Sequence, residues 1–123
     1  MIPNIERTIL CTVLENDFIN NDERIRKFIL DHEYFTLDTH KVIVKAINRL
    51  IELGEPANTD NLRHKMIKHS MHKTSIFKYV GLDDVLTDII SSNAVSYEVL
   101  KGYYDILKKD YQDDLKQKAL MYI

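Results

Sequence analysis

The sequence of 123 residues contains few glycines, prolines and cysteines. It has three glycines, two prolines, one cysteine and no tryptophan. Three scattered glycines cannot form the Gly-rich loop that cradles phosphates, which argues against a nucleotide-binding motor in this stretch. The single cysteine, Cys11, excludes both an intramolecular disulfide and a Cys-x-x-Cys pair, and so low a cysteine content fits a reducing compartment.

An excess of one charge and long apolar runs are also missing. Lysine and arginine total 17 against 19 aspartates and glutamates, which gives a formal net charge of -2. This balance provides no global field that would draw the chain onto nucleic acid. No stretch approaches ~18 uninterrupted apolar residues, and the N-terminus lacks the pattern of a secretory signal. We therefore expect a cytoplasmic protein with no membrane contact and no strong direct binding to DNA.

Apolar residues recur at helical spacing in almost every segment, and no alternation typical of strands persists. With 45% hydrophobic residues, the chain can bury a substantial core. We expect an all-α fold in which residues 1–95 form a compact bundle of about five short helices. A long C-terminal helix, residues 96–123, follows. The short helices are expected near residues 4–14, 20–29, 37–53, 58–68 and 76–90, with Gly81 dividing the last of these.

Residues with short polar side chains indicate where two of these helices begin. Asn20, followed three residues later by Glu23, has the pattern of a capping box and predicts the start of the second helix. Either Thr36 or Asp38 can cap the third helix. The sequence leaves this choice open.

The stretch "GEPANTDNLRHKM", residues 54–66, joins the third and fourth helices. Gly54 lies where a left-handed C-terminal cap belongs, and Pro56 cannot continue the helix. Asn58 can accept hydrogen bonds from the free amides of the next helix. Each of these residues therefore has a structural role, and the stretch is interpreted as a connection between helices, without catalytic chemistry.

The stretch "RHKMIKHSMHK", residues 63–73, is the main candidate for a charged binding site. It combines four lysines or arginines with three histidines, so a nucleic-acid surface and a metal site at His69 and His72 are both conceivable. We favour a solvated cationic face near a helix C-terminus, where the helix dipole favours positive charge. Elsewhere, Cys11 is expected to be a buried packing residue and His40 a packing or capping residue. No nucleophile, base and orienting group come together, so we expect no catalytic, cofactor or metal site.

The C-terminal helix carries one narrow apolar stripe on an otherwise charged surface. A narrow stripe on a long charged helix is typical of a pairing seam, and tyrosine is favoured at protein interfaces. The alternative is that the stripe packs on the other helices of the same domain. We expect four of its members to form an interface with a subunit or partner: Tyr103, Leu107, Tyr111 and Leu115.

Three stretches in this order together resemble a known family. They are "PNIERTILCTVL" near the start, "FTLDTHKVIVKAINRL" in the third helix, and the Gly-x-Pro connection at Gly54. Their order resembles the N-terminal domain of the DnaB-type replicative DNA helicases. Cys11 stands where that family usually has glycine, Thr36 replaces an aromatic residue, and "DDL" replaces Arg-Glu-Leu in the last helix. The positions that match the family's structural motifs are Ile5, Glu6, Leu10, Phe35, His40, Gly54, Pro56 and Asn58.

The resemblance implies a non-catalytic domain. In that family the ATPase motor follows in a separate domain, so ATP and magnesium are expected only there. The N-terminal domains form a collar, a trimer of dimers, on the hexameric ring, and primase and helicase loader proteins dock on it. Residues 96–123 would be the first helix of a hairpin that pairs subunits, with the second helix beyond this chain. We therefore expect this chain to be a helicase fragment, and we expect the fragment to form dimers by itself.

Two other function classes stay open. One is a stand-alone helical adaptor, such as a helicase loader or inhibitor. The other is a small helical DNA-binding domain that uses residues 63–73. A motor domain encoded in the same reading frame would decide for the helicase, and salt-dependent DNA binding would favour the DNA-binding domain.

Overall fold

The computed structural model describes residues 2–121, and within them every regular element is a helix. The all-α prediction is therefore confirmed. Three short 3-10 turns, η1 (His32–Tyr34), η2 (Met71–Lys73) and η3 (Ser75–Phe77), connect the α-helices. The α-helices are α1 (Ile2–Leu14), α2 (Glu23–Arg26), α3 (Asp38–Glu52), α4 (Thr59–Lys68), α5 (Leu82–Ile90) and α6 (Tyr97–Met121).

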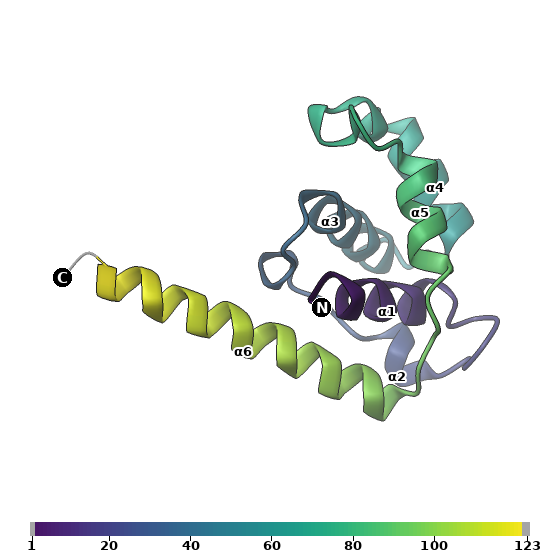
Figure 1. The fold of residues 1–123 in the computed structure, drawn as a ribbon. Helices are drawn as coiled ribbons and strands as arrows, with labels where there is room; N and C mark the ends of the chain where they lie inside the picture. The colour runs from purple at the N-terminus through teal and green to yellow at the C-terminus, as the bar shows by residue number, and fades with distance from the viewer. Residues whose placement is uncertain (1, 122–123) are drawn as a thin grey trace.

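Helix α1 lies at the centre of the bundle (Figure 1). It packs against α5 on one side and against α6 on another, while α3 packs against α4 and η1. Its second half is almost entirely buried, from Ile9 to Leu14. A helix that is apolar on most of its surface must be covered on several sides, which explains this central position.

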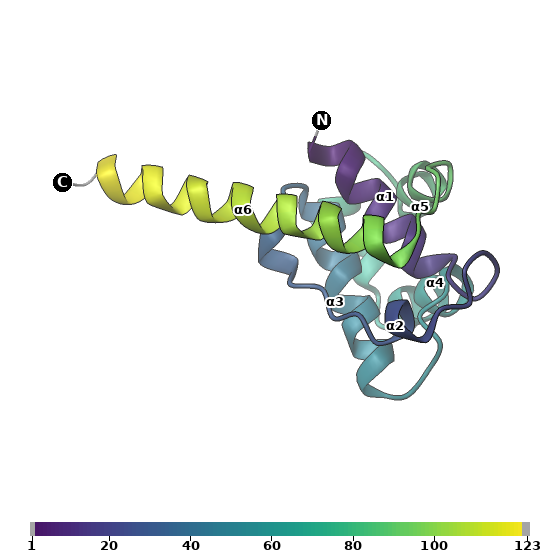
Figure 2. The same cartoon turned by 90° about the horizontal axis from the view of Figure 1, so that it is seen from below.

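Helix α6 crosses the face of the bundle and then extends beyond it (Figure 2). Its start is fixed to α1 through the preceding loop, because the Val95 amide donates to the Thr12 hydroxyl at 3.0 Å. The Cys11 thiol donates to the Ser92 carbonyl at 3.3 Å in the same loop. These contacts satisfy polar groups that would otherwise be buried without partners, and they set the direction in which α6 leaves the bundle.

The connection between α3 and α4 has the predicted form. Gly54 adopts a φ of 71°, the left-handed conformation that a C-terminal cap requires. The Asn58 side chain accepts a hydrogen bond from the Asn61 amide at 2.8 Å and caps α4, which ends at Lys68 as expected. The break at Gly81 is also confirmed, since α5 begins directly after it.

Two predicted caps are wrong. Helix α2 is capped by Asp22, whose carboxylate accepts from the Arg24 amide at 2.8 Å, and Asn20 instead donates to the Val95 carbonyl. The helix has only four residues, Glu23–Arg26, because the chain must turn to place Leu30 in the core. Helix α3 has Leu37 at the cap position, and neither candidate side chain caps it.

Candidate functional site

The predicted interface residues of α6 do not share one environment. Leu107 is 0% exposed and belongs to the core of this chain, so it cannot contact a second chain while this packing persists. Tyr103 is half-buried against the same core. Leu115 is 47% exposed. The stripe is therefore divided into a part that the bundle covers and a part that stays in solvent.

The covered part of α6 lies against a cluster of aromatic rings. The ring of Tyr104 is 5.2 Å from that of Phe28 and 5.6 Å from that of Tyr34, and the Tyr34 ring is 5.2 Å from that of Tyr111. Tilted and edge-to-face pairs at such distances are favourable beyond simple burial. The sequence suggested an interface role for the tyrosines of this helix. Tyr104 and Tyr111 instead pack α6 against η1 of the same chain.

Two tyrosine hydroxyls add polar contacts to this junction. The Asp31 amide donates to the Tyr104 hydroxyl at 2.8 Å, and the Tyr111 hydroxyl donates to a Glu33 carboxylate oxygen at 2.9 Å. Burial raises the pKa of Tyr104. The hydrogen bond to the Glu33 carboxylate, which favours the protonated phenol, raises the pKa of Tyr111. Both tyrosines stay neutral donors or acceptors at physiological pH, and they hold the first half of α6 in place.

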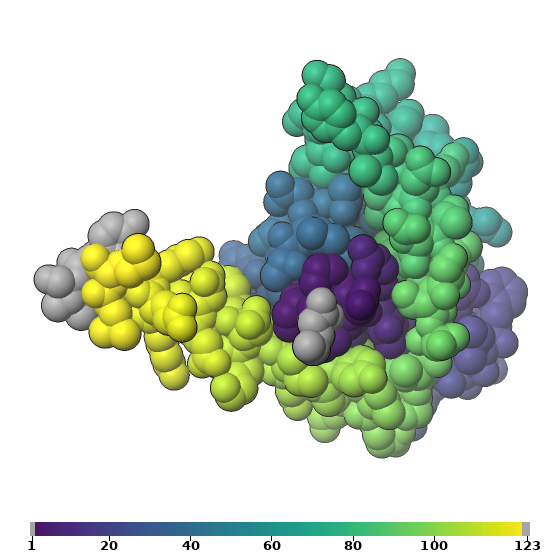
Figure 3. Space-filling view, in the orientation of Figure 1, coloured from purple at the N-terminus to yellow at the C-terminus, as the bar shows by residue number. Residues whose placement is uncertain are grey.

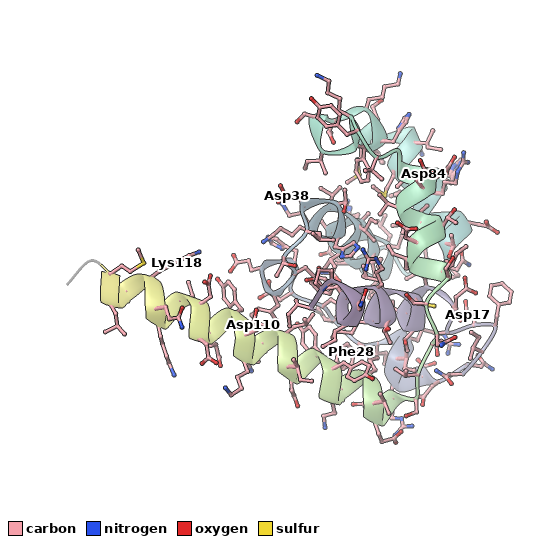
Figure 4. All side chains as sticks on the ribbon, viewed as in Figure 1. Asp17, Phe28, Asp38, Asp84, Asp110 and Lys118 are labelled. Atoms are coloured by element: carbon pink, nitrogen blue, oxygen red, sulfur yellow. The ribbon has the colours of Figure 1, made fainter. Side chains whose placement is uncertain are left out.

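Beyond Tyr111, α6 extends away from the bundle, and Figure 3 shows its last described turns standing clear of the body. Leu115, Leu120 and Met121 are exposed there at 47%, 69% and 82%. Figure 4 labels Lys118 near the free end. Ion pairs at i,i+4 spacing, Lys109–Asp113 at 3.0 Å and Lys118–Asp114 at 3.0 Å, support this free helical end in water. We call residues 112–121 the distal half of α6.

A buried polar cluster joins α1 to the start of α3. The Glu6 carboxylate, 0% exposed, accepts from the Thr36 amide at 2.9 Å and from the Thr36 hydroxyl. Its other oxygen lies 2.8 Å from Nδ1 of His40, which is 2% exposed. The carboxylate therefore satisfies groups at the N-terminus of α3, where the helix dipole favours negative charge.

The pKa of Glu6 reflects two opposing effects. Burial raises it, and the hydrogen bonds from His40 and Thr36 lower it by more, so the pKa lies below its ordinary value. Glu6 and His40 were both identified as family-motif positions, but their contact was not predicted. The two residues are 34 positions apart in the sequence, so no local pattern predicts their contact. The family motif, which contains both residues, is the one sequence feature that points to the pair.

The basic stretch of residues 63–73 does not form one surface. Arg63 pairs with Asp83 of α5, with Nε 2.7 Å from a carboxylate oxygen. Lys65 and Lys68 instead line a groove between α4 and α3, together with His69. The favoured interpretation, a solvated cationic face, therefore describes only part of the stretch. Among residues 2–121, no three His, Cys, Asp or Glu side chains gather in a way that could hold a metal ion.

Cys11 is 1% exposed, and burial, followed by the nearby Glu15 carboxylate, raises the pKa of its thiol, as expected for a packing residue.

Within the described part of the chain, no helix is both long enough and apolar enough to span a membrane.

Comparison with known proteins identifies the family. A family model described as the DnaB-like helicase N terminal domain matches residues 2–109, from the first turn of α1 to the middle of α6. A search of the curated proteins and a search of the solved structures each gave no significant match. The family match covers most of the chain and includes the Glu6–His40 pair, the Gly54 cap and the Asn58 cap. This chain belongs to the DnaB-like helicase N-terminal domain family.

Proposed function

We propose that this chain is the non-catalytic collar domain of a hexameric replicative helicase. Its role is to pair subunits and to provide the surface on which primase or a helicase loader docks during DNA replication. In this proposal the distal half of α6 is the pairing element, as the first helix of a hairpin. The single observation that carries it is that α6 continues beyond the bundle as a helix with exposed apolar residues.

The position of Leu115 supports this role. Residues four apart drift slowly around a helix, so Leu107, Tyr111 and Leu115 follow one side of α6. Leu107 is covered by the bundle and Leu115 is not. A helix of a neighbouring subunit that packed on this side would extend the apolar contact beyond the edge of the bundle. It would bury side chains that are now in solvent.

Sedimentation velocity over a range of protein concentrations tests the pairing. We expect the wild-type chain to show a reversible monomer–dimer equilibrium and Leu115→Glu to shift it to the monomer, with the same helix content by circular dichroism. The matched control is Ile106→Glu, because Ile106 is 45% exposed and lies on the opposite side of α6. Monomers for all three proteins at every concentration, or equal weakening by both variants, would refute pairing through this side.

The proposal differs from a stand-alone adaptor in one observable way. A collar domain is followed by an ATPase domain in the same protein, whereas an adaptor acts on a helicase encoded elsewhere. Sequencing the reading frame downstream of residue 123 therefore separates the two. A Gly-rich phosphate-binding loop with its lysine downstream supports the collar, and a stop codon directly after residue 123 supports the adaptor.

A further inference from the structure

A groove between α3 and α4 carries positive charge only. It has a volume of about 490 Å³, which is in the range of small binding sites. Lys45 and Arg49 line it from α3, and Lys65 and Lys68 line it from α4. No aspartate or glutamate of the described residues lines it, although acidic residues outnumber basic ones in the chain as a whole.

These cations are largely free to bind an external anion. Within residues 2–121, Lys45, Lys65 and Lys68 form no ion pair. Within the same described residues, Arg49 pairs only with Glu52, one turn along α3, and a pair between two such exposed side chains is weak. Arg63, in contrast, is engaged by Asp83 and does not line the groove. The groove therefore concentrates uncompensated positive charge between two packed helices.

Apart from His69, the remaining lining of the groove is apolar. Ala46 is 3% exposed, Met71 is half-buried and Leu53 is 44% exposed. Methionine adapts its shape to different partners, because its side chain is unbranched and flexible. A cationic rim around an apolar floor suits a ligand that presents carboxylates on both sides of an apolar side chain.

We propose that this groove binds a short acidic segment of a partner protein, anchored by one apolar side chain. Charge complementarity selects the acidic segment, and the apolar floor favours a peptide over a nucleic-acid backbone. Among residues 2–121, no Phe, Tyr or Trp lines the groove, so His69 is the one ring there that could stack on a base, and the net charge of -2 opposes approach of a long polyanion. The inference deepens the docking part of the proposed function and rests on it. No residue of α6 lines the groove, so docking there is separable from subunit pairing.

Titration of the ¹⁵N-labelled chain with defined peptides tests the proposal. The probes are nine-residue peptides with aspartates or glutamates flanking a central Leu, Ile, Met or Phe, and the same peptides with a central Ser. We expect at least one apolar-centred peptide to bind with a Kd below about 1 mM and at least about fivefold more tightly than its Ser counterpart. The shifted amides should lie around Lys45, Leu53, Lys65 and Met71, with those of the distal half of α6 unchanged.

The variant Lys45→Glu with Lys65→Glu should weaken this binding at least about tenfold. The matched control, Lys101→Glu, changes an exposed lysine of α6 outside the groove and should leave binding unchanged. Circular dichroism verifies that both proteins are folded. If the double variant is unfolded, the single variant Lys45→Gln, at an exposed position, replaces it with an expected loss of about threefold.

Three results would overturn the proposal. They are no binding by any peptide below 1 mM, binding that is independent of the central apolar residue, and tighter groove binding by a 15-nucleotide single-stranded DNA. The last would assign the groove to nucleic acid. Because these titrations report docking and sedimentation reports pairing, a failure here leaves the pairing result standing. A failure of pairing likewise leaves the titration result unaffected.

Discussion

Glu6 and His40 meet in the interior with a carboxylate oxygen 2.8 Å from the imidazole Nδ1, and both side chains are almost completely shielded from water. The same carboxylate receives two hydrogen bonds from Thr36. One acidic residue of α1 thus replaces the local cap that α3 lacks, and it ties the two helices together. This relationship makes the bundle sensitive to a substitution in its interior.

Replacement of Glu6 by alanine should destabilise the chain by about 2–5 kcal/mol. The variant leaves the buried His40 ring without its partner and removes the acceptor of the Thr36 amide and hydroxyl, and an unsatisfied buried group is costly. Urea unfolding followed by circular dichroism measures the loss. Glu98→Ala, at an exposed ion pair with Arg24, is the control and should change stability by less than about 1 kcal/mol. Equal effects of the two substitutions would contradict the capping role of Glu6.

The contribution of Glu6 should depend on pH in a defined direction. Its pKa in the folded chain lies below the ordinary value of 4.5, so the unfolded chain binds the proton more readily. The stability that Glu6 provides is therefore fully present above about pH 5 and is lost as the pH falls through the folded-state pKa. Urea unfolding of wild type and Glu6→Gln between about pH 6 and pH 3 should give a difference that shrinks in acid. A difference independent of pH would contradict this.

Leu107→Glu should unfold the bundle or destabilise it by more than about 4 kcal/mol, since it places a charge in a fully buried position. Leu115→Glu, eight residues further along the same helix, should change the thermal midpoint little. Circular dichroism melts of the two variants make the comparison. Similar melting of both would show that the bundle does not cover α6 at Leu107.

The Cys11 thiol should react with a thiol reagent at least about a hundredfold more slowly in the folded chain than in urea. It is 1% exposed, it donates to the Ser92 carbonyl, and burial raises its pKa. Since it is the only cysteine, absorbance of the released thiolate measures its rate directly. Rapid labelling without denaturant would show that the loop between α5 and α6 opens readily.

The sequence predicted features that depend on a few neighbouring residues. The left-handed Gly54 and the Asn58 cap follow from local backbone chemistry, and both are confirmed. The sequence-based prediction of a cap failed where a segment far away in the sequence provides the hydrogen bonds. Thr36 was a reasonable cap for α3, but the Glu6 carboxylate reaches its amide and hydroxyl from 30 residues away.

The same limit applies to the stripe on α6. Its spacing predicts that one side of the helix is covered, but spacing alone does not say which surface covers it. The bundle covers Leu107 and leaves Leu115 exposed. The basic groove was missed for a similar reason, because Lys45 and Arg49 come from α3 and lie outside the basic stretch of residues 63–73.

Amide hydrogen exchange at low and high protein concentration tests most directly whether the distal half of α6 pairs subunits. In the monomer this segment has few tertiary contacts and should exchange rapidly, as short unsupported helices do. The account predicts that residues 112–121 become protected as concentration rises, while α3 and α4 keep the same exchange rates. Exchange of residues 112–121 that stays equally fast at all concentrations, or protection that arises only in α3 and α4, would contradict it.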